Sequence, residues 1–430
     1  MSTTPSERSQ TVRLPLRPAR RRPRVLRLGR LWLADVLRSP KGVVPIVRRD
    51  FTSVLTLWAV ARAVNLGILW GFYTISKAAK WGFGPDDAQV KTFLDFLTGW
   101  DADRYLTIAQ FGYPERLPTN QAGDILPNNW AFLPVFPYIT RFLHETTGLS
   151  DQLVAVGLSI LASLGATWMF FVLMRRVTNP RAAWWATTFF SFAPLSFIYV
   201  LGYSEGLALF LTFAALVLAV DRKYVWIAPL GLVAAFTRPG ALALAAALGI
   251  IFLVRMLRQR VDPFPPSQVI GLMFAGLVTA ASGSAWTVIA EKVTGVPNAY
   301  IRTELGWWLG AVGNDPFVPF TPWFRQAGTH LGIFGIALVI ALMVGFVLLI
   351  WSRSVRRLGL VAVSYALSYG LYLFAVFLPQ NSTFRLMVPL SPILGAEPFS
   401  STPRRRNWIL VSCLVLQVVA VWTLWTINHP

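Results

Sequence analysis

Three acidic side chains lie close together in residues 100–137, the longest polar segment of an otherwise apolar chain. They are Asp101, Asp103 and Glu115, and the segment around them, WDADRYLTIAQFGYPERLPTNQAGDILPNNWAFLPVFP, is also dense in aromatic rings. Inverting transfer of a sugar from a phosphate carrier needs a base for the acceptor hydroxyl but no separate acid, because the phosphate leaves as an anion. It also needs cations near that phosphate.

Asp101 is the best candidate for such a base. It follows Trp100 and leads a helical-looking run, DADRYLTIAQFG, so the residues alone favour a helix N-cap as much as a base. Asp103, two residues later, could complete a pair that holds a divalent metal. A D-x-D spacing alone is weak evidence, and we favour one functional acid with the other solvated or paired with Arg104.

Cations suited to a phosphate stand later in the chain. Arg238 in AAFTRPGALAL and Arg385 in NSTFRLMVPLSPIL each interrupt an apolar stretch. A guanidinium fork matches phosphate oxygens, although a long side chain that reaches the membrane surface is the simpler alternative. Glu205, after Tyr203 and Ser204, either favours a helix N-terminus or contacts a sugar hydroxyl.

Arg62 is the one arginine predicted to lie in the middle of an apolar span. It stands in LWAVARAVNLG, with Asn65 on the same helical face. It is either buried against a partner helix or lines the path of a lipid phosphate, and the sequence does not choose.

The elements that must position these residues are membrane spans. The chain has 430 residues, of which 55% are hydrophobic and 13% charged, whereas soluble proteins carry about 25% charged residues. Helices that cross a bilayer need about 20 apolar residues, and on this measure eleven spans are predicted: 51–76, 152–174, 181–200, 203–220, 224–237, 240–254, 267–290, 331–351, 358–378, 384–398 and 406–427. One cysteine and three scattered histidines exclude an internal disulfide framework and zinc-type spacing.

The loops predict an orientation. Alternate loops are basic, as in RRVTNPR, RMLRQR, SRSVRR and PRRR, and positive charge prefers the cytoplasmic side. The acids and isolated arginines then share the other face, where acids and arginines at the ends of apolar helices are costly unless they serve a function. The topology therefore predicts a site at the outer leaflet.

The predicted organisation is a tail, residues 1–50, followed by a transmembrane domain, residues 51–430, with its catalytic loop at about 77–150. The tail holds thirteen Lys and Arg and three acids of a chain with net charge +20. Nucleic-acid binding is the weaker interpretation, because the tail has no stacking aromatic before Trp32 and adjoins a membrane domain; we expect a partly disordered cytoplasmic segment near anionic lipid and no nucleic-acid partner. It does not have the pattern of a cleavable signal peptide.

The run WDADRYLTIAQFGYP followed by AFLPVFP resembles the signature of the PIG-V family, the GPI-anchor second mannosyltransferases, and of its bacterial relatives. YSEGL (203–207), the Arg238 and Gly240 pair and FRLMVPLSP (384–392) are similar to later elements of that family. Relatives often carry His where Arg104 stands, and an acid or His where this chain has Asn128 and Asn129.

The resemblance implies an all-α polytopic membrane protein of the GT-C glycosyltransferase type, in a bacterial plasma membrane, with a polyprenyl-phosphate mannose donor and a glycolipid or protein acceptor. It makes Asp101 the expected catalytic base. No metal ligands are assigned, although a divalent metal is possible. The expected substrate-binding residues, with Trp100 beside them, are Asp103, Arg104, Tyr105, Tyr113, Tyr203, Glu205, Arg238 and Arg385.

Three alternatives remain from the sequence. A transferase of another polyprenyl-phosphate sugar, such as glucose or arabinose, differs in no recognisable residue pattern. A flippase or transporter of lipid-linked sugars predicts charges in the middle of several spans and often repeated halves. A non-catalytic membrane scaffold does not require an acid at Asp101.

Overall fold

The computed structural model describes residues 35–37, 46–81, 92–309, 317–377 and 379–427. Most of the predicted basic tail and part of the predicted catalytic loop lie outside these ranges. Within them the chain is helical and forms no strand, apart from one isolated bridge between Thr119 and Ile125. The expected all-α architecture is therefore confirmed for the described part of the chain.

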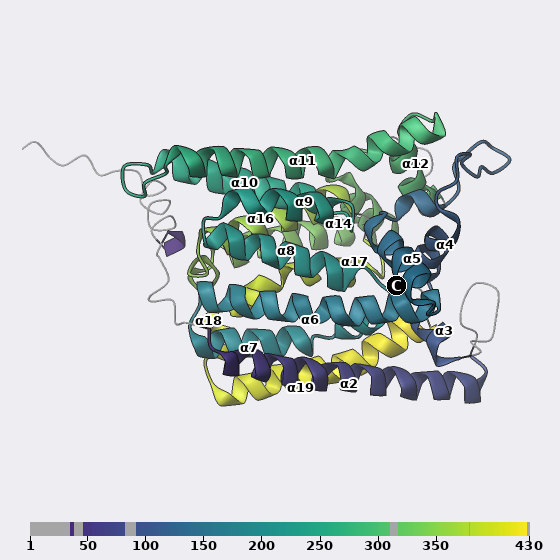
Figure 1. Ribbon diagram of the computed structural model, residues 1–430, viewed down its shortest axis with the longest axis horizontal. Coiled ribbons are helices and arrows are strands. Elements are labelled where there is room, and N and C mark those ends of the chain that lie inside the picture. The colour runs from purple at the N-terminus through teal and green to yellow at the C-terminus, as the bar shows by residue number, and fades with distance from the viewer. Residues whose placement is uncertain (1–34, 38–45, 82–91, 310–316, 378, 428–430) are drawn as a thin grey trace, which may run out of the picture.

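Most of the helices run along the long axis of the molecule (Figure 1). Five described helices are long and apolar enough to cross a membrane: α2 (Arg48–Ala79), α6 (Asp151–Val177), α11 (Pro266–Thr294), α14 (Thr321–Trp351) and α19 (Pro403–Val421) with its π-helical continuation η5 (Trp422–Ile427). Shorter apolar helices lie among them: α7 (Pro180–Ser191), α8 (Glu205–Val220), α9 (Ile227–Ala235) preceded by η3 (Tyr224–Trp226), α10 (Ala241–Leu257) and α16 (Leu360–Val376).

Two predicted spans are interrupted at prolines. The prediction of one spanning helix at 384–398 is wrong. This segment contains α17 (Thr383–Leu386), the 3-10 segment η4 (Val388–Gly395) and the start of α18 (Glu397–Ser400). Pro389 and Pro392 explain the break, because proline has no N–H and clashes with the preceding helical turn. The 181–200 span likewise ends as an α-helix at Ser191, before Pro194, and resumes as the 3-10 segment η2 (Ser196–Val200).

Short helices cluster at the right-hand end of the bundle in Figure 1. They come from the long polar segment and from the stretch after α11, and are α3 (Phe93–Leu97), α4 (Asp101–Phe111), η1 (Asn129–Ala131), α5 (Val135–Thr147) and α12 (Ala299–Gly306). We call this cluster of short helices the polar end. The sequence analysis placed no helix at α5 or α12.

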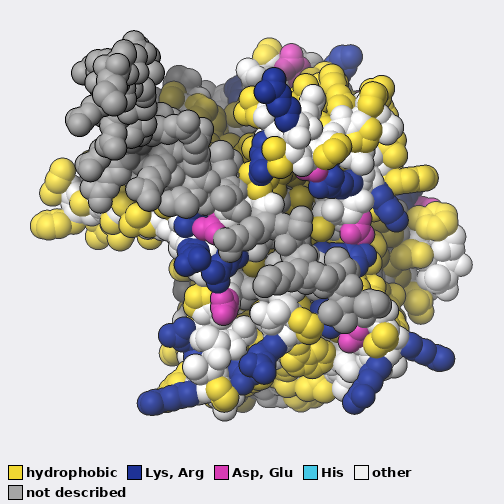
Figure 2. Space-filling view, turned by 90° about the vertical axis from the view of Figure 1, so that its left-hand side faces the viewer, with side chains coloured by type: hydrophobic (Ala, Val, Ile, Leu, Met, Phe, Trp, Pro, Cys, Tyr) yellow, Lys and Arg dark blue, Asp and Glu magenta, His cyan; other side chains and the backbone are white. Residues whose placement is uncertain are grey.

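The opposite end of the bundle is basic. Figure 2 faces it and shows many more Lys and Arg side chains than acids. The acids there are engaged, as in Arg176 with Asp221 at 2.9 Å and Arg222 with Asp262 at 2.9 Å. The loops that the sequence analysis assigned to one side of the membrane therefore do lie together, and the side they face stays a prediction.

Arg62 has a structural role. Its guanidinium is buried against η2, where it donates to the carbonyls of Ser191 at 2.9 Å and Ser196 at 3.2 Å. These carbonyls stand free because α7 is broken there, and the arginine also lies over the Tyr199 ring at 4.9 Å. Of the two open alternatives for Arg62, the structure selects burial against a partner segment.

Candidate active site

Asp101 is the first residue of α4, and its side chain does not cap the helix. Trp100 occupies the N-cap position with φ 57° and ψ −120°, a backbone conformation that is costly for a residue with a side chain. The indole of Trp100 packs against the core, and its Nε1 donates to the carbonyl of Trp425 at 3.4 Å. This anchored, strained residue sets the direction in which Asp101 leaves the backbone.

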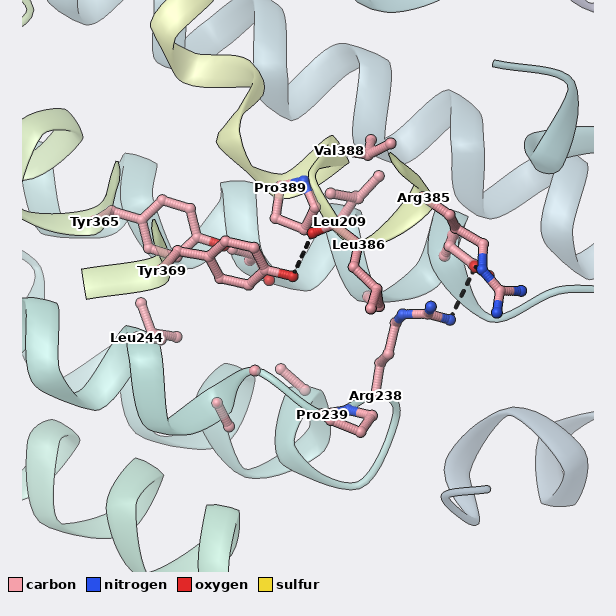
Figure 3. Close-up of a pocket in the computed structure, with 16 residues that line it drawn as sticks. Leu209, Arg238, Pro239, Leu244, Tyr365, Tyr369, Arg385, Leu386, Val388 and Pro389 are labelled. Carbon is pink, nitrogen blue, oxygen red and sulfur yellow. Dashed lines mark hydrogen bonds and ion pairs between the residues drawn. The ribbon is translucent and has the colours of Figure 1, made fainter. Parts of the chain in front are cut away.

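Asp101 belongs to a network of four charges. Its Oδ2 lies 2.6 Å from Nη1 of Arg385, whose Nε lies 3.3 Å from Oε1 of Glu205. The same oxygen of Glu205 is 2.9 Å from Nη1 of Arg238. Figure 3 shows the two guanidinium groups approaching each other from opposite sides. Two carboxylates and two guanidinium groups give a formally neutral set.

These charges are largely removed from solvent. The exposed fraction of the side chain is 4% for Glu205, 9% for Arg385, 15% for Arg238 and 24% for Asp101. Neither oxygen of Glu205 has an aligned hydrogen bond, and neither has Nε or Nη1 of Arg385; of these atoms, Oε1, Nε and Nη1 lie within ion-pair distance of an opposite charge. Buried charges normally fill their hydrogen-bonding capacity, so the network has donors and acceptors left for a ligand.

Separate elements hold the network in place. Arg238 leaves the turn between α9 and α10, where Gly240 has φ 136° and its missing Cβ lies 3.3 Å from the Tyr369 ring. Arg385 stands in α17 above the ring of Tyr203, 5.2 Å from its centroid. The hydroxyl of Tyr369 donates to the carbonyl of Leu386 at 2.9 Å, which fixes α17 against α16.

A pocket opens beside the two arginines. Apart from the charged groups its lining is mostly apolar, and Figure 3 labels its main members, which are Leu209, Pro239, Leu244, Tyr365, Tyr369, Leu386, Val388 and Pro389. Arg238 and Arg385 lie at one end of this lining. The arrangement suits an amphiphile with an anionic group beside an apolar chain.

Two further predicted residues, Tyr105 and Tyr203, lie beside the network. The hydroxyl groups of Tyr105 and Ser204 share a hydrogen bond of 2.8 Å, and burial raises the pKa of Tyr105 to about 12. Tyr203 is buried beneath Arg385, so its ring faces the cation.

The remaining predicted residues lie outside the network. Asp103 is exposed on α4. The guanidinium of Arg104 lies 5.8 Å from the ring of Trp307, just after α12. Tyr113 packs against Trp130 and Trp286 at ring distances of 4.8 and 5.0 Å and donates to the carbonyl of Phe132.

The sequence analysis missed Glu304 on α12. Burial raises the pKa of its carboxyl from 4.5 to about 7, the charge of Asp101 adds to the rise, and a hydrogen bond from Tyr300 and the charge of Arg238 oppose it. The charges of Asp101 and Arg238 therefore act on the carboxyl of Glu304 from the neighbouring network. Glu304 stands in IRTELGWW, which matches no motif, and an isolated acid between two predicted spans gives no signal in the sequence.

The structure separates the environments of the two acids of the D-x-D run, which the sequence analysis weighed as a possible metal pair and did not favour. Asp101 is engaged by Arg385 and Asp103 is exposed. Over the described ranges, no three His, Cys, Asp or Glu side chains gather as ligands for a metal ion. Asn128, which stands where relatives of the PIG-V family often carry an acid or His, has a structural role here. Its side chain accepts a hydrogen bond from the N–H of Trp130 and donates one to Thr303 Oγ1 at 3.0 Å.

The fold and the site together define a polytopic helical membrane protein with a charged pocket at its polar end. No model of a known protein family matches the sequence. The chain is similar to GPI alpha-1,6-mannosyltransferase 2 of Rattus norvegicus, with 32% identity over 143 residues, 31% of this chain and 27% of the relative. The Mus musculus protein is 34% identical over 143 residues (31% and 27%), and the Homo sapiens protein 29% over 153 residues (33% and 28%).

The resemblance to the GPI second mannosyltransferases is thereby confirmed, and it spans little more than a quarter of the length of these relatives. Among solved structures, the oligosaccharyltransferase of Archaeoglobus fulgidus in complex with Zn and sulfate aligns with a TM-score of 0.40 and 14% identity, over 86% of this chain and 53% of that chain. Its complex with an inhibitory peptide and a dolichol-phosphate aligns with a TM-score of 0.40 and 15% identity, over 85% and 55%.

Proposed function

We propose that this protein is an inverting glycosyltransferase of the GT-C type. It moves mannose from polyprenyl-phosphate mannose to a hydroxyl group of a lipid or protein acceptor, at the extracytoplasmic face of a bacterial plasma membrane. The observation that carries the proposal is the network of Asp101, Arg385, Glu205 and Arg238, of which the last three line a largely apolar pocket. The similarity to mannosyltransferases supports the choice of sugar.

The two arginines suit the donor phosphate. A polyprenyl-phosphate sugar carries a phosphodiester with one negative charge, and the polyprenyl phosphate that leaves gains a second. Arg238 and Arg385 compensate this growing charge from a site largely closed to water, where such interactions are stronger than in solution. The apolar lining beside them accommodates the start of the polyprenyl chain.

Asp101 takes the proton in this scheme. The acceptor oxygen attacks C1 of mannose, the bond between C1 and the phosphate oxygen breaks, and the electron pair leaves with polyprenyl phosphate. The acceptor proton goes to Oδ2 or Oδ1 of Asp101. When the phosphate draws Arg385 towards itself, the 2.6 Å ion pair of Asp101 is weakened, so donor binding frees the base. Glu205 keeps both arginines in place.

The alternative of a lipid-linked sugar flippase has less support. It predicts charges deep within several spans, and the mid-span Arg62 instead donates from both of its Nη atoms to backbone carbonyls at the break after α7. The charges of the network gather instead at one end of the bundle.

The test is transfer of labelled mannose from polyprenyl-phosphate mannose to endogenous lipid and protein in membranes that contain wild type, Asp101→Asn or Asp103→Asn at equal levels. We expect Asp101→Asn to lose about 10²- to 10⁴-fold in rate, the usual contribution of a general base. Asp103→Asn is the matched control and should stay within about threefold of wild type, because Asp103 is exposed.

Equal transfer by wild type and Asp101→Asn contradicts the role of the base and leaves the reaction class intact. If wild type transfers no mannose, a panel of polyprenyl-phosphate glucose and arabinose donors follows. Absence of transfer from every donor excludes the enzyme proposal and favours the flippase or scaffold.

A further inference from the structure

The helix α19 ends in a π-helix that lies behind the charged network. α19 runs from the basic end to the polar end of the bundle, and its continuation η5 contacts α3 and the residue before α4 (Figure 1). The wide turn of η5 is closed by Thr426 Oγ1, which donates to the carbonyl of Val421 at 2.9 Å. Single π-helical turns are rare in α-helices and are frequent at functional sites.

Trp425 is the fully buried side chain of this π-helix. The centroid of its ring lies 6.2 Å from that of Phe96, 6.5 Å from that of Phe197 and 5.7 Å from that of Tyr203. Trp422, in the same turn, is 44% exposed. The aromatic contacts with the site therefore belong to Trp425 and not to the whole turn.

One residue separates Trp425 from each member of the Asp101 and Arg385 ion pair. The carbonyl of Trp425 accepts from Nε1 of Trp100, and Asp101 is the next residue in the chain. The ring of Trp425 packs edge-on against Tyr203, and the guanidinium of Arg385 lies 5.2 Å from the centroid of that same tyrosine. Trp425, Tyr203 and Arg385 also line one small, mostly apolar pocket.

The conformation of Trp100 explains why an anchor is needed. Its φ of 57° and ψ of −120° are costly for a residue with a side chain, and such strain persists only where the surrounding structure holds it. Two backbone hydrogen bonds close the turn, from the N–H of Ala102 to the Gly99 carbonyl at 3.2 Å and from the N–H of Asp103 to the Trp100 carbonyl at 3.1 Å. A turn that relaxes redirects Asp101.

We propose that Trp425 is a positioning residue for the ion pair of Asp101 and Arg385. The inference rests on the proposed function and adds the π-helix η5 to the elements that build the site. Trp425 acts through Trp100 on the carboxylate and through Tyr203 on the guanidinium. The reaction is unchanged, and the acceptor proton goes to Asp101.

The first experiment measures kcat and donor KM of mannose transfer at equal protein levels. We expect Trp425→Leu to lower kcat about 10- to 100-fold, the usual result when a catalytic group is misplaced by a remote change. The donor KM should change less than about threefold, because Arg238 and most of the apolar lining stand on other elements. Trp425→Phe keeps a ring against Tyr203 and should recover most of the loss.

Trp422→Leu is the matched control, since it makes the same change on the exposed side of the same turn, and it should stay within about twofold of wild type. A kcat of Trp425→Leu equal to that of Trp422→Leu overturns the inference.

A double variant separates positioning from general support of the fold. In the Asp101→Asn background the base is already lost, so Trp425→Leu should lower the remaining rate by a factor at least about threefold smaller than in wild type. The same factor in both backgrounds shows that Trp425 only stabilises the fold, and it overturns the inference.

A further readout does not depend on transfer. The amide groups of Ala102 and Asp103 should exchange with deuterium about tenfold faster in detergent-solubilised Trp425→Leu than in wild type, and unchanged in Trp422→Leu, while the helix α5 at the same end stays protected. Faster exchange throughout the chain, with a lowered melting temperature, overturns the inference. If wild type transfers no sugar and the exchange is faster only at this turn, the positioning of the two charges stands and the proposed function falls.

Discussion

At the scale of single residues, Arg385 connects the two carboxylates of the network. It contacts Asp101 through Nη1 and Glu205 through Nε, and its guanidinium is fixed above Tyr203. A lysine at this position offers one point charge in place of a planar fork. The bridging geometry therefore depends on the chemistry of arginine as well as on its charge.

We predict that Arg385→Gln lowers mannose transfer about 100-fold or more, because it removes a cation from the leaving phosphate. Arg385→Lys should recover part of this loss, since lysine restores the charge without the bridge. The measurement is kcat and donor KM in membranes with equal protein levels. Arg405→Gln, on the basic end, is the control and should leave both unchanged; a loss there equal to that of Arg385→Gln contradicts the assignment.

Glu304 also makes a prediction about stability and pH. Its pKa is about 7 in the folded protein and near 4.5 when exposed, so between these values the folded state binds a proton that the unfolded state does not. Stability is therefore lost as the pH rises through this window. We expect the melting temperature of wild type, relative to Glu304→Gln, to fall between pH 5 and pH 8 in detergent. A difference independent of pH shows that Glu304 keeps its ordinary pKa.

At the scale of elements, close backbone packing fixes the position of α12. The close approach of Gly306 to the Ile125 carbonyl brings the helix against the long polar segment. Two helix breaks also position charged groups. The end of α7 exposes the Ser191 carbonyl that binds Arg62, and the turn between α9 and α10 carries Arg238.

Gly306→Ala tests this packing. The added methyl group meets backbone atoms of residues 125–127, which yield less readily than a side chain, and overpacking costs about 1–3 kcal/mol. We expect the melting temperature of Gly306→Ala to fall, because α12 has to move away from this backbone. Gly157→Ala in α6 is the matched control, since a Cβ there meets nothing within 4 Å; equal behaviour of the two variants contradicts this packing.

At the scale of the whole molecule, charge separates the two ends of the bundle. The basic loops form one end and the carboxylate and arginine network lies near the other (Figures 1 and 2). The positive-inside rule then predicts that the basic end faces the cytoplasm and that the site opens outside.

This orientation is tested in a Cys413→Ser background, which removes the single cysteine. Glu115→Cys at the polar end and Arg260→Cys at the basic end are both exposed positions. We expect a membrane-impermeant maleimide to label Glu115→Cys in intact cells and Arg260→Cys only after permeabilisation. The reverse pattern places the site on the cytoplasmic side and rules out the proposed topology.

The sequence alone determined the class of fold and the residues of the network. Apolar runs long enough to span a bilayer have few alternatives to helices, because the backbone must satisfy its own hydrogen bonds in lipid. Arg238, Arg385, Glu205 and Asp101 stood out because charges beside apolar spans are costly. The same reasoning could not distinguish the helical breaks at Pro194 and Pro389 from complete spans, since composition does not record where tertiary contacts replace lost hydrogen bonds.

Only the tertiary structure decided the pairings. Asp101 and Arg385 are nearly 300 residues apart in the chain, and no local pattern specifies that they meet. For Arg62 the sequence left burial against a helix and the path of a lipid phosphate both open, and the folded chain supplied carbonyls that bind it. The sequence analysis did not single out Glu304, whose pKa is raised by burial in the folded chain. Residue type and apolar length are local properties that the sequence carries, whereas burial and electrostatic neighbourhood arise from long-range packing.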